Sequence, residues 1–160
     1  MIRAALIVIA LAFAGCAATG SVLPPALGGT SASQDREALS RSLDALHEGF
    51  EQGRIYRVLS QISGAYNDDE GRDYKALRAD LKELFSSYRR IRVTRTHPRL
   101  KLTGDRATAV ETVGIIAEPY NMDTHAPVNI YGGVTLEYAR HDDGRWAVVS
   151  MSRQKDGSGG

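Results

Sequence analysis

A few side chains of this 160-residue chain combine a reactive group with a placement that could support chemistry. Glu111 is the best-placed carboxylate, because it shares one face of an expected strand with Ala109, Val113 and Ile115. A carboxyl group buried on such a face could serve as a general acid or base. The same position also fits the rim of a strand or an ion pair with an arginine. Glu137, on a more polar stretch, is expected to be solvated.

The four histidines, His47, His97, His125 and His141, are isolated from one another in the sequence. No spacing among them is typical of a metal site, and there is no second cysteine to complete one. The chain also lacks the phosphate-binding loop, the dinucleotide fingerprint and the serine-nucleophile motif of hydrolases. We therefore expect no metal, no cofactor and no recognisable catalytic set. His47 is expected to be packed or partly exposed beside the apolar face of a helix.

Cys16 is the only cysteine, and the residues before it are typical of a secreted bacterial protein. A basic start, Met1–Arg3, leads into an apolar run over 4–14 that is too short to span a bilayer, which takes about 17–25 residues. The stretch Ala14-Gly15-Cys16 resembles the lipobox of bacterial lipoproteins, although Phe13 stands where leucine is usual. That resemblance implies cleavage before Cys16 and lipid on its thiol. The alternative is an ordinary signal peptide that is cut after Ala14.

A lipidated Cys16 would place the protein in the bacterial cell envelope, with the membrane as its first partner. Ala17, rather than aspartate, follows the cysteine. By resemblance to enterobacterial lipoproteins, this favours the outer membrane, facing the periplasm, over the inner membrane. The chain carries 20 Lys and Arg against 19 Asp and Glu, without the excess of positive charge that is typical of nucleic-acid-binding proteins. We therefore expect no nucleic-acid partner.

Composition divides the chain into four parts. The signal peptide covers 1–15, and Cys16 opens a flexible tether over 16–34 that is rich in Ala, Gly, Ser, Thr and Pro. One domain is expected over 35–152. A disordered tail is expected over 153–160, which ends in glycines.

Apolar periodicity predicts helices in the first half of the domain. Leucines and Phe50 recur every three or four residues up to a stop at Gly53. A shorter helix follows over 55–62. Asp73 can cap a third helix over 74–88.

The second half changes to the alternation that is typical of half-buried strands. Strands are expected over 90–94, 100–102, 107–117, 130–138 and 146–151. Pro98 is expected to separate the first strand from the second, and Asp143-Gly144 indicates a hairpin turn. Three helices followed by antiparallel strands predict the α+β class.

The order of these elements and several short stretches resemble the nuclear transport factor 2-like (SnoaL-like) domain. The most similar stretches are 63–66, 84–88, 100–107 and 143–148. The resemblance covers residues 36–152 and implies a cone, in which N-terminal helices pack on a curved antiparallel sheet. A cystatin-like sheet is the competing fold, and it fits three helices less well.

The resemblance also implies a ligand pocket between the helices and the sheet. The candidate lining residues are Tyr66, Tyr88, Glu111, Tyr131 and Trp146. Segment 66–69 resembles a Tyr-x-Asp-Asp stretch of isomerase-type members, but a helix follows it where those members have a strand. No catalytic base is therefore assigned, and a surface turn explains Asp68 and Asp69. Related domains often pair through the outer face of the sheet, which implies that a homodimer could form.

These observations favour a membrane-anchored envelope lipoprotein whose domain binds an apolar small molecule or a partner protein without catalysis. One alternative is a SnoaL-like isomerase or hydrolase that acts on an apolar small molecule. Another is an accessory module that binds through its sheet face.

Overall fold

A computed structural model describes residues 28–154 of the chain. Three helices precede five strands: α1 Gly28–Glu51, α2 Ile55–Leu59, α3 Tyr74–Ser87, β1 Tyr88–Arg95, β2 Arg99–Thr103, β3 Arg106–Pro119, β4 Val128–Arg140 and β5 Trp146–Arg153. The expected α+β class is confirmed. The predicted signal peptide, Cys16 and the tail from residue 155 onward lie outside the described residues.

The first helix begins earlier than its sequence suggests. α1 starts at Gly28, so residues 28–34 of the expected tether are helical, and the domain begins before residue 35. Contacts just inside the helix hold this end in place: Asp35 accepts hydrogen bonds from Arg140 Nη1 at 3.3 Å and Trp146 Nε1 at 3.4 Å. Because extending a formed helix costs far less than starting one, a helix held at Asp35 continues through the small residues before it.

All strand pairs of the sheet are antiparallel, and the strand order is β1-β3-β4-β5. The long strand β3 carries two partners on one side, because β1 pairs with 113–119 and β2 pairs with 106–110. The break between β1 and β2 contains Pro98, as predicted. β2 therefore forms a short edge of its own at one end of the sheet.

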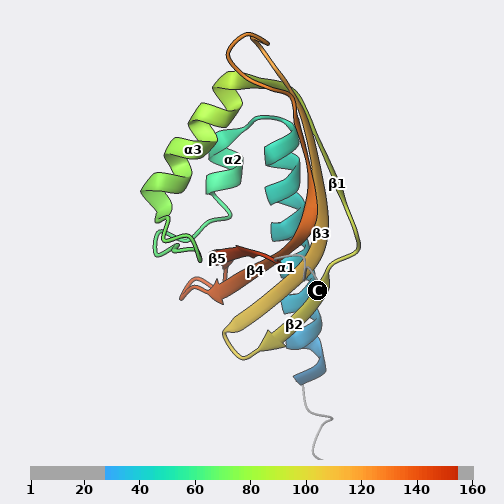
Figure 1. Ribbon diagram of the computed structural model, residues 1–160. Helices are drawn as coiled ribbons and strands as arrows, with labels where there is room; N and C mark the ends of the chain where they lie inside the picture. The colour runs from blue at the N-terminus through green and yellow to red at the C-terminus, as the bar shows by residue number, and fades with distance from the viewer. Residues whose placement is uncertain (1–27, 155–160) are drawn as a thin grey trace, which may run out of the picture.

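The three helices cover one face of this curved sheet (Figure 1). The core lies between the two layers and includes Leu39, Leu43, Val58, Leu59, Leu77, Leu81, Ala109, Leu136, Tyr138 and Val148. The periodic leucines of the sequence thus point toward the sheet, as the spacing predicts. The opposite face of the sheet has no helical cover in the described part of the chain.

The predicted cap of the third helix is confirmed. Asp73 precedes α3, and its Oδ1 accepts a hydrogen bond from the N–H of Ala76 at 2.8 Å. We expect Asp73→Ala to lower the free energy of unfolding by about 1 kcal/mol, because a helix N–H loses its acceptor. Urea denaturation measures this change. The nearby exposed Asp69→Ala is the control, and an equal loss in both variants would contradict the assigned cap.

Candidate functional site

The most unusual polar contact of the interior joins α1 to the sheet. Glu111 lies on the inner face of β3, and its side chain has no solvent exposure. His47 reaches it from α1, with 2.6 Å between Nε2 and Glu111 Oε1, and keeps 15% side-chain exposure. A carboxylate that is fully removed from water needs such a partner, because desolvating an unpaired charge is costly.

An arginine approaches the second oxygen of the same carboxylate. Arg95 Nη1 lies 3.8 Å from Glu111 Oε2, and Arg95 also pairs with Asp44 on α1. Glu111 is therefore buried on the apolar face, as one expectation had it, and it also lies beside an arginine, as the other did. His47 is packed and partly exposed, as expected, but its pairing with Glu111 has no local signal in the sequence.

Glu111, His47, Arg95 and Tyr138 form a group that we call the Glu111 cluster. Two of its polar atoms, Glu111 Oε2 and Tyr138 Oη, have no hydrogen-bond partner among the described residues. Tyr138 is 1% exposed and lies on β4. Burial raises the pKa of its hydroxyl far above the usual range, and the nearby Glu111 adds to the shift. The neighbouring Ser42 hydroxyl, which donates to Gln61 Oε1 at 2.9 Å, opposes it. The hydroxyl is therefore a neutral, desolvated group beside a buried carboxylate.

We expect Tyr138→Phe to raise the free energy of unfolding by about 1 kcal/mol, because it removes a buried hydroxyl that has no partner. The matched control is Tyr66→Phe, which removes a buried hydroxyl that donates to Asp68 Oδ2 at 3.2 Å. This control is expected to lose stability. Urea denaturation of both variants checks the difference, and a loss at Tyr138 as large as at Tyr66 would contradict the geometry.

A second buried carboxylate lies in the loop between α2 and α3. Asp68 Oδ1 accepts hydrogen bonds from the N–H groups of Glu70 at 3.0 Å and Arg72 at 2.8 Å. Its Oδ2 accepts from Arg72 Nε at 2.8 Å and from the Tyr66 hydroxyl. The expected surface turn is correct for Asp69, which is exposed, and wrong for Asp68, because the loop folds around the Asp68 carboxylate.

The remaining pocket candidates do not converge on one cavity. Tyr66 is 2% exposed in the Asp68 loop, where burial raises the pKa of its hydroxyl and Asp68 adds to the effect. Tyr88 donates to Ala126 O at 3.1 Å. Trp146 is buried near the start of α1. Tyr131 is 76% exposed.

Tyr131 lies on the outer face for a reason that strand alternation explains. It pairs with Gly114, and its ring lies close to the position that a Cβ of Gly114 would take. Glu111 is an odd number of residues from Gly114 along β3, so it points to the inner face. The aromatic side chain of Tyr131 does not by itself tell which face of the sheet the residue occupies.

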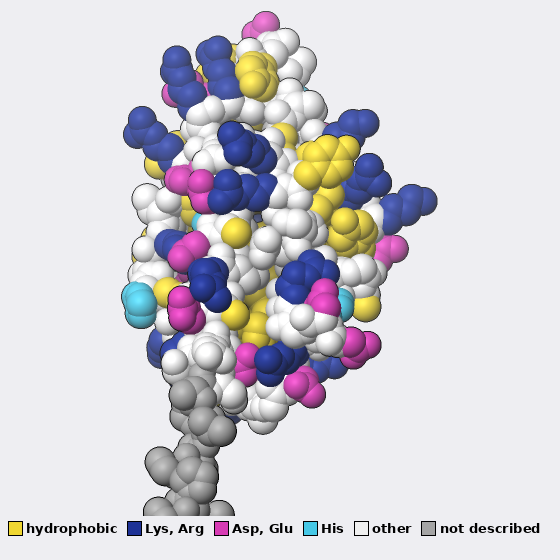
Figure 2. Space-filling model, turned by 180° about the vertical axis from the view of Figure 1, so that it is seen from behind, with side chains coloured by type: hydrophobic (Ala, Val, Ile, Leu, Met, Phe, Trp, Pro, Cys, Tyr) yellow, Lys and Arg dark blue, Asp and Glu magenta, His cyan; other side chains and the backbone are white. Residues whose placement is uncertain are grey.

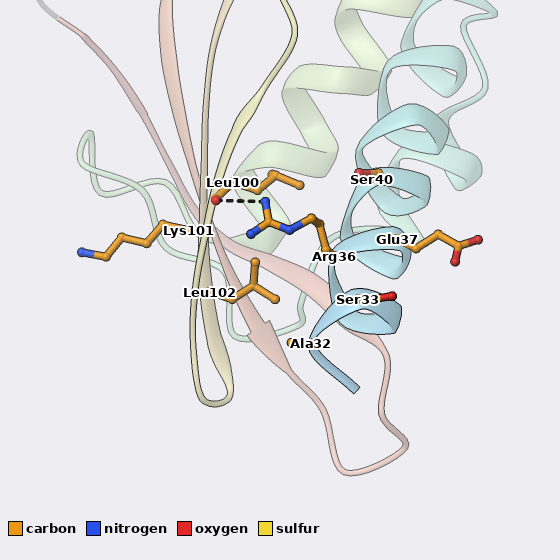
Figure 3. Close-up of a pocket in the computed structure, with 8 residues that line it drawn as sticks. All are labelled: Ala32, Ser33, Arg36, Glu37, Ser40, Leu100, Lys101 and Leu102. Carbon is orange, nitrogen blue, oxygen red and sulfur yellow. Dashed lines mark hydrogen bonds between the residues drawn. The ribbon is translucent and has the colours of Figure 1, made fainter. Parts of the chain in front are cut away.

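An open groove of about 870 Å³ lies between α1 and β2, away from the Glu111 cluster. Figure 3 shows Leu100 and Leu102 pointing toward α1, while Lys101 points away from it. The lining residues are Ala32, Ser33, Arg36, Glu37, Ser40, Leu100, Lys101 and Leu102. The groove thus combines leucines on the β2 wall with small and charged residues on the α1 wall, where Figure 3 shows Glu37 pointing away from β2.

Arg36 lies across this groove. Its Nη1 approaches the Leu100 carbonyl oxygen at 3.5 Å, which is long for a hydrogen bond. Within residues 28–154, no carboxylate forms an ion pair with Arg36, whereas the neighbouring Glu37 pairs with Arg41. An exposed guanidinium with one weak partner can bind an anion that enters the groove.

Residues 28–154 hold no cluster of His, Cys, Asp and Glu that could bind a metal ion. In the same range, no helix has the length and apolar character to cross a membrane. The arrangement therefore offers two places for chemistry: the buried Glu111 cluster and the open groove at Arg36.

No family model matches the chain, and no curated protein matches it. Solved structures do match its fold. A nuclear transport factor 2-like superfamily protein from Salmonella enterica aligns over 81% of this chain and 99% of its own, with a TM-score of 0.66 and 12% identity. A candidate scytalone dehydratase from Novosphingobium aromaticivorans aligns over 81% and 89%, with a TM-score of 0.66 and 12% identity.

A candidate aromatic ring hydroxylase from Novosphingobium aromaticivorans is similarly close, with a TM-score of 0.66, 17% identity, and coverage of 76% of this chain and 89% of its own. At such identities the likeness concerns the fold and not the reaction. The sequence predicts this same fold, in which helices pack on one face of a curved antiparallel sheet. The domain therefore has the nuclear transport factor 2-like fold.

Proposed function

We propose that this protein is a lipoprotein of the bacterial envelope whose domain binds an apolar anionic ligand in the groove between α1 and β2. The observation that carries the binding function is Arg36, an arginine without an ion-pair partner in the described chain, placed beside Leu100 and Leu102. Ligand sites typically combine apolar walls with a few polar groups that fix orientation. The groove has this composition and a volume of about 870 Å³.

The position of the open groove favours binding over catalysis. The Glu111 carboxylate is fully buried beneath His47 and Arg95, and neither it nor His47 lines the groove. A reacting group must reach its substrate within hydrogen-bond distance. In this arrangement the accessible recess and the buried acid–base groups are separate.

The binding function can be tested with 8-anilinonaphthalene-1-sulfonate, whose rings match the leucines and whose sulfonate matches Arg36. We expect Arg36→Glu to weaken binding of this probe at least about tenfold, which corresponds to 1.4 kcal/mol. Lys101→Glu is the matched control, because it makes the same charge change on a side chain that points away from α1 and Arg36. Equal effects of the two variants, or no effect of Arg36→Glu, would reject the groove as the binding site.

The proposed anchor rests on Cys16 and its lipobox-like neighbours. Lipid on this cysteine would hold the domain at a membrane, with α1 beginning at Gly28 shortly after it. Ala17 favours the outer membrane, facing the periplasm. Homodimerisation through the outer face of the sheet stays a prediction, which sedimentation of the purified chain would test.

A second candidate function is acid–base catalysis at Glu111. The observation in its favour is the 2.6 Å contact with His47, together with the unpartnered Glu111 Oε2. A carboxylate and an imidazole in contact can exchange a proton, as an isomerase or dehydratase requires. This candidate predicts turnover of an apolar hydroxy-ketone or enone that is lost in Glu111→Gln and retained in Arg36→Glu. The opposite pattern, or no turnover, favours the binding function.

A further inference from the structure

Exposed large apolar side chains are concentrated at one end of the molecule. Six such residues are exposed in the described chain, and one of them, Tyr56, lies on α2. The other five surround the end of the β3–β4 hairpin and its loop; we call them the tip patch: Ile116, Tyr120, Met122, Ile130 and Tyr131. Scattered apolar residues are ordinary on a protein surface, but a contiguous group indicates an interaction site.

The tip patch occupies both faces of the hairpin as well as its loop. Tyr131 lies on the outer face with Ile116, which is two residues beyond the Gly114 that pairs with Tyr131. Ile130 is the neighbour of Tyr131 along β4 and so points to the opposite face. Tyr120 and Met122 lie in the loop between the two strands, with exposures of 61% and 68%. A single flat protein partner would cover one of these faces, whereas insertion into an apolar layer covers all of them.

Arginines at the start of β1 accompany the patch. The Arg89 guanidinium lies 6.0 Å from the Tyr120 ring centroid, and Arg92 pairs in register with Ile116. Glu118 neutralises part of this charge, since it contacts Arg90 at 2.8 Å and Arg89 at 3.9 Å. Arg92 is exposed and forms no ion pair with the described residues, so its charge remains available.

The patch also lies far from the proposed groove. In Figure 1 the β3–β4 loop is at the top of the molecule, and α1 begins at the bottom. Figure 2 shows apolar side chains between Lys and Arg side chains in its upper third. Tyrosine with arginine is a combination that favours the boundary between lipid headgroups and acyl chains, where a ring is half buried and a cation meets phosphate.

We propose that the tip patch inserts into the surface of an anionic lipid bilayer. Tyr120 and Met122 enter the headgroup region first, Ile116, Ile130 and Tyr131 follow, and Arg89 and Arg92 pair with lipid phosphates. The contact itself needs no lipid on Cys16. It rests on the proposed function in one respect only, because the proposed anchor is what places a membrane near the tip patch. α1 is about 36 Å long, and the 11 residues between Cys16 and Gly28 can extend to about 40 Å. Anchor and tip can therefore reach one bilayer when the domain is tilted with its tip toward the membrane.

The test uses the full purified chain, with a tryptophan placed by Tyr120→Trp as the reporter. The matched control is Tyr56→Trp, which alters the one exposed large apolar residue outside the patch. Each variant is mixed with phosphatidylcholine vesicles, with or without phosphatidylglycerol, whose acyl chains carry bromine. The native Trp146 is buried at 2% exposure and contributes the same background to both variants.

We expect the Tyr120→Trp variant to lose emission and shift to shorter wavelength on the anionic vesicles, and the Tyr56→Trp variant to do neither. Adding Arg92→Glu to the Tyr120→Trp variant should reduce the loss. Equal quenching of the two reporters would mean that the chain contacts lipid without using the tip, and this overturns the proposal. Absence of quenching also overturns it and would favour a protein partner for the patch. Neither outcome bears on lipidation of Cys16, which is measured separately.

Discussion

Replacing His47 with alanine is expected to lower the free energy of unfolding by about 3 kcal/mol. The reason is the carboxylate that the change leaves behind. Glu111 has no solvent exposure, and its remaining charged neighbour, Arg95, lies 3.8 Å from Oε2. A buried charge without a close partner destabilises the folded state far more than an exposed ion pair stabilises it. Urea denaturation of the two proteins measures the loss.

The pairing itself is tested by a double-mutant cycle with Glu111→Gln. If the two side chains act together, the double variant should be more stable than the sum of the single losses predicts, because the neutral glutamine needs no charged partner. Arg41→Ala on the exposed side of α1 serves as the control, and it should change stability by less than about 0.5 kcal/mol. Strict additivity, with a small loss for His47→Ala, would contradict the assigned contact.

Replacing Asp68 with asparagine is expected to cost about 2–3 kcal/mol at neutral pH, because the carboxylate accepts four hydrogen bonds while its side chain is buried. The asparagine NH2 group would face donors at one of the two oxygen positions. Asp69→Asn, on the exposed neighbour, should change little. Urea denaturation of both variants at pH 7 distinguishes the two positions.

The same carboxylate gives stability a defined pH dependence. Burial alone would raise the pKa of Asp68, but the N–H and guanidinium of Arg72 outweigh burial and hold that pKa below its ordinary value of 3.8. A group whose pKa is lower in the folded state stabilises the fold fully above its unfolded pKa, and this contribution is lost as pH falls through the folded value. The stability difference between the wild-type protein and Asp68→Asn should therefore be constant from about pH 5 to 8 and shrink below about pH 4. A difference that persists unchanged to pH 2 would contradict the hydrogen-bond assignment.

Local features of the fold could be predicted from sequence because each depends on neighbouring residues. The Asp73 cap and the break at Pro98 follow from backbone chemistry that involves only a few consecutive positions. The leucine spacing of α1 similarly identifies its buried face. The start of α1 at Gly28, before the expected domain boundary at residue 35, is not a local feature, because the contacts that hold Asp35 come from β4 and β5, more than 100 residues away.

The candidate site was harder to predict, because its parts meet only after the chain folds. His47 and Glu111 are 64 positions apart, and neither carries a local sign of the other. The groove forms where one side of α1 faces the free edge of β2, which no periodicity in either segment indicates. The aromatic ring of Tyr131 predicts an inner pocket residue, whereas its pairing with Gly114 places it on the outer face.

We propose that lipid on Cys16 holds this domain at a membrane. Metabolic labelling of cells with radioactive palmitate tests it directly, by comparing the wild-type protein with Cys16→Ser. We predict that the wild-type protein takes up label and is cleaved before Cys16, while Cys16→Ser takes up none and keeps its first 15 residues. An unlabelled wild-type protein, or a Cys16→Ser variant that is cut normally after Ala14, would contradict the account and favour an ordinary secreted protein.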